Sequence, residues 1–312
     1  MNGYAVRISP VVSAALADGQ PVVALESTVF SQLGLPAPAG AEARKRVYEA
    51  VHAGGASPAM TAVLDGVARV GVDDEDLPRV FTADRKVGER DLPVAVAQRW
   101  PAGATTVSAS LALAATAGIE VFATGGIGAV HRDWVETGDE SADLGALARH
   151  PVVTVCAGAK AFLDLPRTLE RLETLGVPVI GLGTDGGGFP AFWSRRSGLP
   201  VPHEVATAAE AARVVTAARA LGYRGGVVVV TPVPEQDEVP FEELRPIIDA
   251  ALADAADARI TGGAVTPFVI ERMAAATGGR TVAANLALVE HNAAVAADIA
   301  AALASPPPSS DV

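Results

Sequence analysis

The sequence contains almost no cysteine. Cys156 is the only one among 312 residues, which excludes a disulfide framework. No cysteine and histidine residues are spaced as in a zinc site. Chains without disulfides are typical of reducing compartments. We therefore expect a cytoplasmic protein.

The chain is also short of positive charge. Its 24 lysine and arginine residues face 36 acidic ones, a net charge of −12. This field repels phosphate-coated polymers, and the sequence has no local basic stripe that would bind nucleic acid. Only Arg7 precedes an N-terminal apolar run that Pro10 and Asp18 interrupt, which makes a poor signal peptide. The uncharged stretch 100–119 has the length of a membrane span, but its small and polar residues predict a buried core helix. We expect neither a nucleic-acid nor a membrane partner.

Apolar residues make up 50% of the chain and charged residues 19%, which excludes a disordered protein. Short apolar runs rich in β-branched residues predict strands at 21–25, 59–64, 121–124, 152–156, 177–182 and 226–230. Amphipathic segments predict helices at 40–53, 90–100, 143–149, 165–175, 207–221, 242–256 and 281–303. This alternation predicts an α/β/α sandwich with a mostly parallel central sheet, in one large domain over 1–304. The Pro/Ser-rich segment 305–312 is expected to be a disordered tail.

Lysine is rare: the chain has three, against twenty-one arginines. Arginine stays protonated in proteins, whereas a desolvated lysine can attack a carbonyl-type carbon and form a Schiff base. Lys45 belongs to a charged helix face and is expected to be solvated. Lys160 follows the apolar strand 152–156, so we consider it a candidate nucleophile. The alternative is a lysine that reaches from a strand end to solvent.

Acidic groups provide further candidates. Glu26 ends the first apolar strand, where a partly desolvated carboxyl group can serve as a general acid; a loop or cap carboxylate is the alternative. Residues 133–143 hold five carboxylates beside His131. They suit either a hydrated divalent ion or a solvated acidic loop. The glycine-containing segments 103–110 and 125–128 offer backbone N–H groups to a phosphate, or are ordinary turns.

Several strings in the sequence resemble one family, the pseudouridine-5'-phosphate glycosidases, also called the indigoidine synthase A-like family. The resemblance covers about Ile8 to Ala304. It rests on Ala24-Leu-Glu-Ser-Thr, Pro58-Ala-Met-Thr-Ala-Val-Leu-Asp-Gly, Gly103-Ala-Thr-Thr-Val, Val121-Phe-Ala-Thr-Gly-Gly-Ile-Gly-Ala-Val-His-Arg, Ser141-Ala-Asp-Leu, Val155-Cys-Ala-Gly-Ala-Lys, Leu172-Glu-Thr-Leu-Gly-Val-Pro-Val-Ile-Gly and Val265-Thr-Pro-Phe.

The resemblance implies a homotrimeric enzyme that reversibly makes or breaks the carbon–carbon bond between C1 of ribose 5-phosphate and an aromatic ring carbon. It implies that Lys160 is the nucleophile, that Glu26 protonates the departing ring oxygen of the sugar, and that Asp139 is a ligand of a divalent metal, usually Mn²⁺. It places Asn285 near the ring. The positions that it assigns to the sugar phosphate are Lys86, Thr106, Val107, Ser141, Ala142 and Asp143.

The chain departs from the family pattern at Gln32 and Leu33, at Thr231, at Gly186 to Gly188 and at Glu89. These changes replace groups expected to hold a polar uracil, and they place an acid near the phosphate. On this basis we expect C-ribosylation of a non-uracil aromatic acceptor, as in alnumycin-type antibiotic biosynthesis. The alternatives are a pseudouridine-5'-phosphate glycosidase, a Schiff-base aldolase and a non-catalytic sugar-phosphate binding protein.

Overall fold

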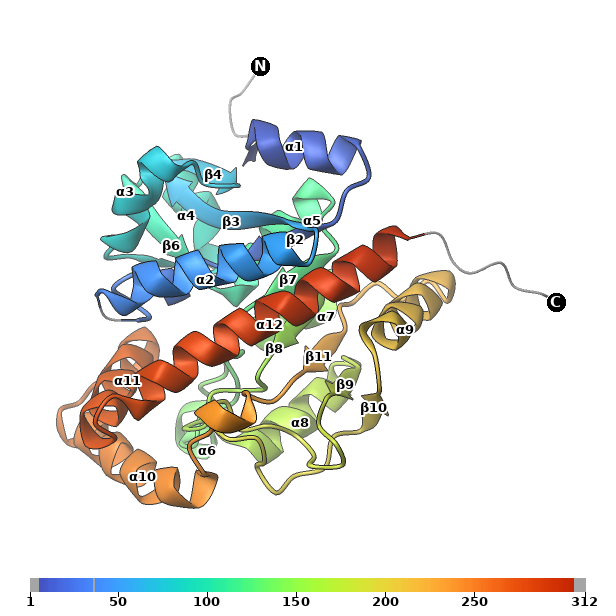
Figure 1. Ribbon diagram of the computed structural model, residues 1–312. Helices are drawn as coiled ribbons and strands as arrows, with labels where there is room; N and C mark the ends of the chain where they lie inside the picture. The colour runs from blue at the N-terminus through green and yellow to red at the C-terminus, as the bar shows by residue number, and fades with distance from the viewer. Residues whose placement is uncertain (1–5, 36, 306–312) are drawn as a thin grey trace.

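The computed structural model describes residues 6–35 and 37–305. Within these ranges the chain forms one 11-stranded, mostly parallel sheet with helices on both faces (Figure 1). The predicted single-domain α/β/α fold is confirmed. Of the expected tail at 305–312, all but Ser305 lies outside the described residues.

Most strands of the sheet are short, and β3 is the longest, with 8 residues. The strands are β1 (Arg7–Ile8), β2 (Val22–Leu25), β3 (Ser57–Leu64), β4 (Val67–Val70), β5 (Lys86–Val87), β6 (Ala102–Thr105), β7 (Val121–Ala123), β8 (Val153–Cys156), β9 (Val179–Leu182), β10 (His203–Val205) and β11 (Val228–Val230). Their order is β1-β4-β3-β2-β7-β8-β11-β9-β10, with β6 pairing β3 and β5. All pairs are parallel except β3–β4 and β3–β6.

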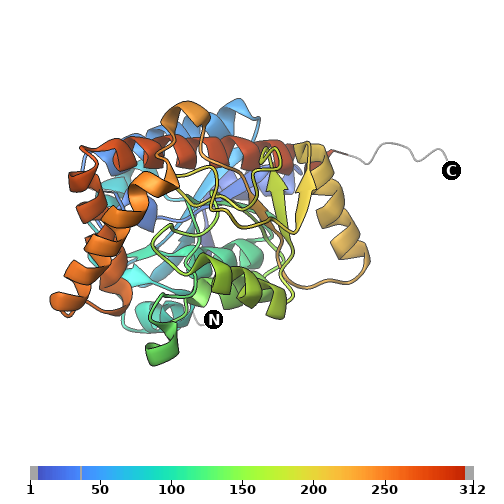
Figure 2. The ribbon, with the colours of Figure 1, turned by 90° about the horizontal axis from the view of Figure 1, so that it is seen from below.

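The helices lie on both faces of this sheet. The α-helices are α1 (Pro10–Ala17), α2 (Ala39–Ala53), α3 (Leu77–Phe81), α4 (Leu92–Ala97), α5 (Val107–Ala117), α6 (Trp134–Thr137), α7 (Ala142–Arg149), α8 (Leu165–Thr174), α9 (Ala208–Ala220), α10 (Phe241–Asp257), α11 (Val265–Ala276) and α12 (Arg280–Ala304). Short 3₁₀ turns are η1 (Thr28–Phe30), η2 (Asp74–Asp76), η3 (Glu89–Asp91), η4 (Glu235–Asp237) and η5 (Gly262–Ala264). The long α12 crosses one face, and the green helices cover the other (Figure 2).

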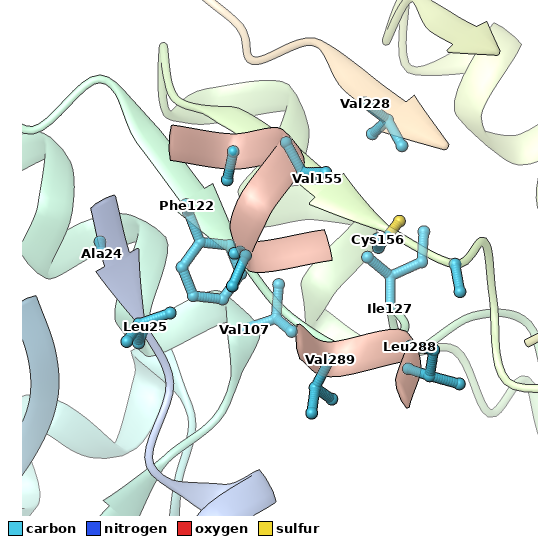
Figure 3. Packing of buried hydrophobic residues seen from close by; sticks show 14 of the residues in the cluster. Ala24, Leu25, Val107, Phe122, Ile127, Val155, Cys156, Val228, Leu288 and Val289 are labelled. Carbon is cyan, nitrogen blue, oxygen red and sulfur yellow. The ribbon is translucent and has the colours of Figure 1, made fainter. Parts of the chain in front are cut away.

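The centre of the fold is formed by β2, β7 and β8, which are hydrogen-bonded neighbours and run parallel. Their side chains are buried throughout, which explains the continuous apolar runs in the sequence. Figure 3 shows this core with residues from the three strands, α5 and α12: Ala24, Leu25, Val107, Phe122, Val155, Cys156, Leu288 and Val289. Because the three strands are parallel, their carboxyl ends meet at one edge of the sheet.

One sequence prediction is wrong. The stretch 100–119 is not a single core helix: it contains β6 followed by α5. Pro101 and Gly103 disfavour a helix, and β6 instead gains hydrogen bonds from β3 and β5. The short strands β1, β4, β5 and β10 were not predicted, because each contains a charged residue and none forms a continuous apolar run.

By length and composition, α12 is the one helix in the described ranges that could cross a membrane. Its buried residues, among them Ala284, Leu288, Ala293 and Ala296, belong to the main hydrophobic core. In this fold α12 is therefore a core helix.

Candidate active site

A cavity of about 420 Å³ opens at the carboxyl ends of the central strands. Its lining includes every site residue predicted from the sequence. They come from β5, α5, α7 and α12 and from loops, including those that follow β2 and β8. These residues are Glu26, Lys86, Thr106, Val107, Asp139, Ser141, Ala142, Asp143, Lys160 and Asn285. The fold thus brings together positions that span most of the chain.

Glu26 follows β2 directly and is buried. Thr124 follows the neighbouring strand β7, and its hydroxyl donates a hydrogen bond to Glu26 Oε1. Burial raises the pKa of Glu26 from 4.5 to about 7, although the positive charge of Lys160 and the Thr124 hydrogen bond act in the opposite direction. A carboxyl group with a pKa near neutrality can give up a proton at physiological pH.

Lys160 lies in the loop after β8, the strand next to β7, four residues beyond its end. The loops that follow β7 and β8 run together, because the N–H of Ala157 donates to Gly125 O (2.9 Å) and that of Lys160 to Ile127 O (3.3 Å). Gly158 makes this path possible: its φ is +79°, and a Cβ there would collide with the carbonyl oxygen of Pro190. Lys160 and Glu26 consequently face the same cavity.

Lys86 supplies the second cavity lysine, from β5. Burial and the neighbouring Lys160 lower the pKa of Lys86 to about 8. Its Nζ donates to the carbonyl oxygen of Gly263 at 3.0 Å. Gly263 belongs to the η5 turn before α11, so this contact brings a late segment of the chain against the cavity.

Asp143 ties two loops together at the cavity wall. Its Oδ1 accepts from the N–H of Ser108 (3.0 Å) near the start of α5, and its Oδ2 accepts from the N–H of Gly128 (2.8 Å) in the loop after β7. A side chain at position 128 would collide with Ser141 and Asp143, which explains the glycine. Each of the two glycine-containing segments that could either approach a phosphate or form ordinary turns therefore donates one backbone N–H to Asp143.

The predicted metal ligand Asp139 lies on the cavity with a partly exposed carboxylate. His131 Nδ1 is 3.7 Å from its Oδ2, and Arg171 Nε engages the adjacent Glu140 at 2.9 Å. Across residues 6–35 and 37–305, no three His, Cys, Asp or Glu side chains come together as a metal cluster. One carboxylate with open surroundings fits an ion that keeps most of its waters, not a fully protein-coordinated ion.

Several side chains of the cavity lining are apolar. They are Phe192, Ile270 and Val289, with Leu33 and Leu35 from the segment after η1. Phe192 has a φ of +59°, an uncommon conformation for a residue with a side chain. The polar side chain of Asn285 lines the cavity one turn before Val289 on α12, and its Oδ1 accepts a hydrogen bond from Trp193 Nε1 at 2.9 Å.

Most departures from the family pattern do not reach the cavity. The side-chain amide of Gln32 donates to the carbonyl oxygens of Thr82 (2.9 Å) and Ala83 (3.2 Å), and Thr231 pairs with His291 Nε2 at 3.0 Å. Gly186 to Gly188 lie outside the cavity lining. Glu89 turns away toward Arg149 and His150, so it does not oppose a phosphate. Only Leu33 contributes to the wall. The cavity lining therefore gives no support at Gln32, Thr231 and Gly186 to Gly188 for the expectation that these changes remove contacts to the ring.

Sequence reasoning assigned no role to Thr124, Phe192 or Trp193. Thr124 could have been found, because it ends the predicted strand 121–124 and directly follows β7, just as Glu26 follows the first apolar strand. Phe192 and Trp193 lie in a loop between β9 and β10, far in sequence from their partners, and no local pattern marks them.

The sequence profile of the family described as "Indigoidine synthase A like protein" matches residues 11–302. The chain belongs to this family. Among its relatives, a protein of Methylobacterium nodulans is 52% identical over 297 residues, covering 95% of this chain and 87% of the relative. A protein of Deinococcus radiodurans is 50% identical over 296 residues, covering 94% and 93%. Both are named pseudouridine-5'-phosphate glycosidase.

Solved structures of the indigoidine synthase A-like family have the same fold. The prealnumycin C-glycosynthase AlnA, solved in complex with ribulose 5-phosphate, is 35% identical and has a TM-score of 0.87, with 97% of this chain and 98% of AlnA covered. An indigoidine synthase A-like protein from Thermotoga maritima is 34% identical, also with a TM-score of 0.87, and the coverage is 98% and 99%. These relatives confirm the predicted class, an enzyme of C-glycosidic bonds.

Proposed function

We propose that the protein is a pseudouridine-5'-phosphate glycosidase, which reversibly converts pseudouridine 5'-phosphate and water into uracil and ribose 5-phosphate. The observation that carries this proposal is the shared cavity of Lys160 and the buried Glu26, whose pKa of about 7 suits a proton donor. The names of relatives about 50% identical support uracil as the ring. They favour this alternative over the non-uracil acceptor expected from the sequence.

In the proposed reaction, neutral Lys160 Nζ bonds to C1 of the sugar. The bond between C1 and the ring oxygen breaks, and Glu26 gives its proton to that oxygen. The lysine nitrogen then loses a proton, and its lone pair forms an iminium as the C1–carbon bond to uracil breaks. The electron pair of that bond remains on the uracil carbon, which takes up a proton. Water hydrolyses the iminium and releases open-chain ribose 5-phosphate and free Lys160.

The remaining cavity residues have proposed binding roles. The ammonium of Lys86 and the hydroxyls of Thr106 and Ser141 line the side assigned to the sugar phosphate. We assign the part lined by Asn285, Phe192 and Val289 to the ring. Charge and hydroxyl groups suit a phosphorylated sugar, and an apolar wall with one amide suits a flat heterocycle.

We also propose that Asp139 holds a divalent cation, Mn²⁺ by family resemblance, together with water. When bound, such a cation supplies positive charge near the anionic substrate. The single partly exposed carboxylate supports an ion of this hydrated kind. The homotrimer that the resemblance implies stays a prediction.

The decisive assay follows the ultraviolet absorbance of uracil release from pseudouridine 5'-phosphate with Mn²⁺ present. Steady turnover is expected. The second candidate is C-ribosylation of another aromatic ring, supported by the structural similarity to AlnA. That function predicts no uracil release and a ring-joined product by mass spectrometry.

Borohydride trapping tests the covalent step and separates the enzyme from a sugar-phosphate binding protein. Wild type incubated with ribose 5-phosphate should gain a stable adduct at Lys160. Lys160→Ala and Lys160→Arg should form none and lose nearly all turnover, because a guanidinium stays protonated. Lys45→Ala on the exposed face of α2 is the matched control and should behave as wild type. An adduct on Lys160→Arg would disprove the assignment.

A further inference from the structure

The orientation of the Asn285 side chain is determined by a single neighbour. Trp193 Nε1 and Asn285 Oδ1 are 2.9 Å apart, and both residues are buried. An indole N–H can only donate a hydrogen bond, so the amide atom facing it must be the oxygen. The amide nitrogen Nδ2 is consequently directed away from Trp193.

Trp193 itself is held firmly. Its side chain is completely buried and makes an edge-on contact with Phe192, with ring centroids 5.0 Å apart. The ring of Phe162 lies 6.4 Å away on centroids. The carbonyl oxygen of Trp193 accepts from the N–H of Val239 at 2.9 Å. The indole therefore has a fixed position from which it sets the orientation of Asn285.

Asn285 belongs to the ring side of the cavity. It precedes Val289 by one turn of α12, and both residues line the cavity with Phe192. A Cβ added at Gly125 would lie 3.1 Å from Val289 and 3.5 Å from Phe192, so these two side chains converge on the same point. Among residues 6–35 and 37–305, no protein acceptor pairs with Asn285 Nδ2. Its N–H donors are thus available to a ligand.

We infer that Trp193 is a positioning residue that fixes the amide of Asn285 with its nitrogen toward the cavity, so that the site selects a ring presenting a carbonyl oxygen. This inference rests on the proposed function. An amino group at the same point of the ring would face another donor, and both groups would lose their hydrogen bonds. Without the indole N–H, the amide can rotate by half a turn and present its oxygen to an amino group.

The first test compares three free rings as inhibitors of pseudouridine 5'-phosphate cleavage: uracil, cytosine and isocytosine. The last two each replace one carbonyl oxygen of uracil with an amino group. Wild type should bind uracil about tenfold or more tightly than at least one of them. In Trp193→Phe, uracil binding should weaken about threefold to tenfold. The preference for uracil over the analogue that wild type discriminates against should fall below about threefold.

Two controls distinguish a loss of Asn285 positioning from general damage to the active site. Trp100→Phe removes an indole hydrogen bond of the same kind, to Gln98 Oε1 at 2.9 Å, outside the cavity. It should leave all three inhibition constants unchanged. The KM of ribose 5-phosphate in the synthetic direction should change less than about twofold in Trp193→Phe, because the loss concerns the ring. Unchanged discrimination in Trp193→Phe, or equal weakening of every ligand including ribose 5-phosphate, would overturn the inference.

A second measurement does not depend on turnover. The chain has three tryptophans, so ¹⁵N-labelled protein should give three indole signals, and Trp193→Phe identifies one of them. Asn285→Asp keeps an acceptor for the indole and should leave that signal hydrogen-bonded, whereas Asn285→Leu should shift it and speed its exchange. No shift in Asn285→Leu would overturn the inference. If wild type fails to release uracil but the shift occurs, the proposed function is wrong and the hold of Trp193 on Asn285 stands.

Discussion

Thr124 supports the proton donor from both its side chain and its backbone. Its hydroxyl donates to Glu26 Oε1, while its carbonyl oxygen accepts from Asn292 Nδ2 at 2.7 Å. Asn292 also donates to the carbonyl oxygen of Gly125 at 3.2 Å. Helix α12 thereby anchors the end of β7, and β7 orients the carboxyl group that follows β2.

Replacing Thr124 should change the pH dependence of the reaction. Glu26 acts as an acid when protonated, so kcat of wild type should fall as pH rises through about 7. The Thr124 hydroxyl favours the ionised carboxylate and lowers the pKa of Glu26. In Thr124→Val the fall should therefore move to higher pH, by about one unit.

The kcat–pH profile of cleavage measures this shift. Thr116→Val removes an exposed hydroxyl of α5 that bonds Ala112 O at 2.8 Å, and it should leave the profile in place. A shift to lower pH in Thr124→Val would contradict the role given to its hydroxyl.

Glu26→Gln should exchange activity for stability. Folding raises the pKa of Glu26 from 4.5 to about 7, so the folded chain keeps a proton that the unfolded chain releases between these values. The contribution of this proton to stability is complete below pH 4.5 and is lost as pH rises to about 7. Above pH 7 the neutral glutamine variant should be more stable than wild type, by about 3 kcal/mol.

Urea unfolding at pH 5 and pH 8 provides the comparison. The advantage of Glu26→Gln should be much larger at pH 8, while turnover should decrease about 10²-fold to 10⁴-fold. Glu49→Gln, on an exposed position of α2, is the control. An equal advantage at both pH values would show that the buried charge is not its source.

Lys86 should make phosphate binding depend on pH. Because the pKa of Lys86 is lowered to about 8 by burial and by Lys160, the free enzyme loses this positive charge near that pH. The KM of pseudouridine 5'-phosphate should therefore rise above about pH 8. In Lys86→Met the KM should be roughly 10- to 100-fold higher at pH 7, with the rise above pH 8 abolished.

Unphosphorylated pseudouridine gives the internal control for this variant. Its KM should respond little to Lys86→Met, since it has no phosphate for the ammonium to bind. If Lys86→Met raised the KM of both substrates equally, Lys86 would not bind the phosphate.

Removing metal should test Asp139. Dialysis against a chelator should abolish activity, and Mn²⁺ should restore it. Asp139→Asn should bind Mn²⁺ more weakly by electron paramagnetic resonance titration, because the amide replaces an anionic ligand. Asp133→Asn changes an exposed acid of the same segment and should bind as wild type. Undiminished binding by Asp139→Asn would refute the assignment.

The sequence predicted the central strands and helices, whose apolar patterns are clear, and the site residues that follow such strands. Glu26 and Lys160 could be found because each follows a continuous apolar strand, and parallel strands bring such positions to one edge. The contact of Lys86 with Gly263 spans 177 residues, and that of Trp193 with Asn285 spans 92. Such contacts depend on the tertiary conformation of the loops, which a local sequence pattern does not predict. The prediction of one helix over 100–119 was wrong for a related reason, because β6 is stabilised by strands that are distant in sequence.

Helix α12 carries Asn285, Val289 and Asn292 along one side over two turns. The first two line the cavity where we place the ring, and the third reaches the strand end that orients Glu26. The same helix therefore positions both the residues proposed to select the ring and the strand end that orients the proton donor. Changes that tilt or loosen this C-terminal helix, even from its far end, should disturb both halves of the reaction together.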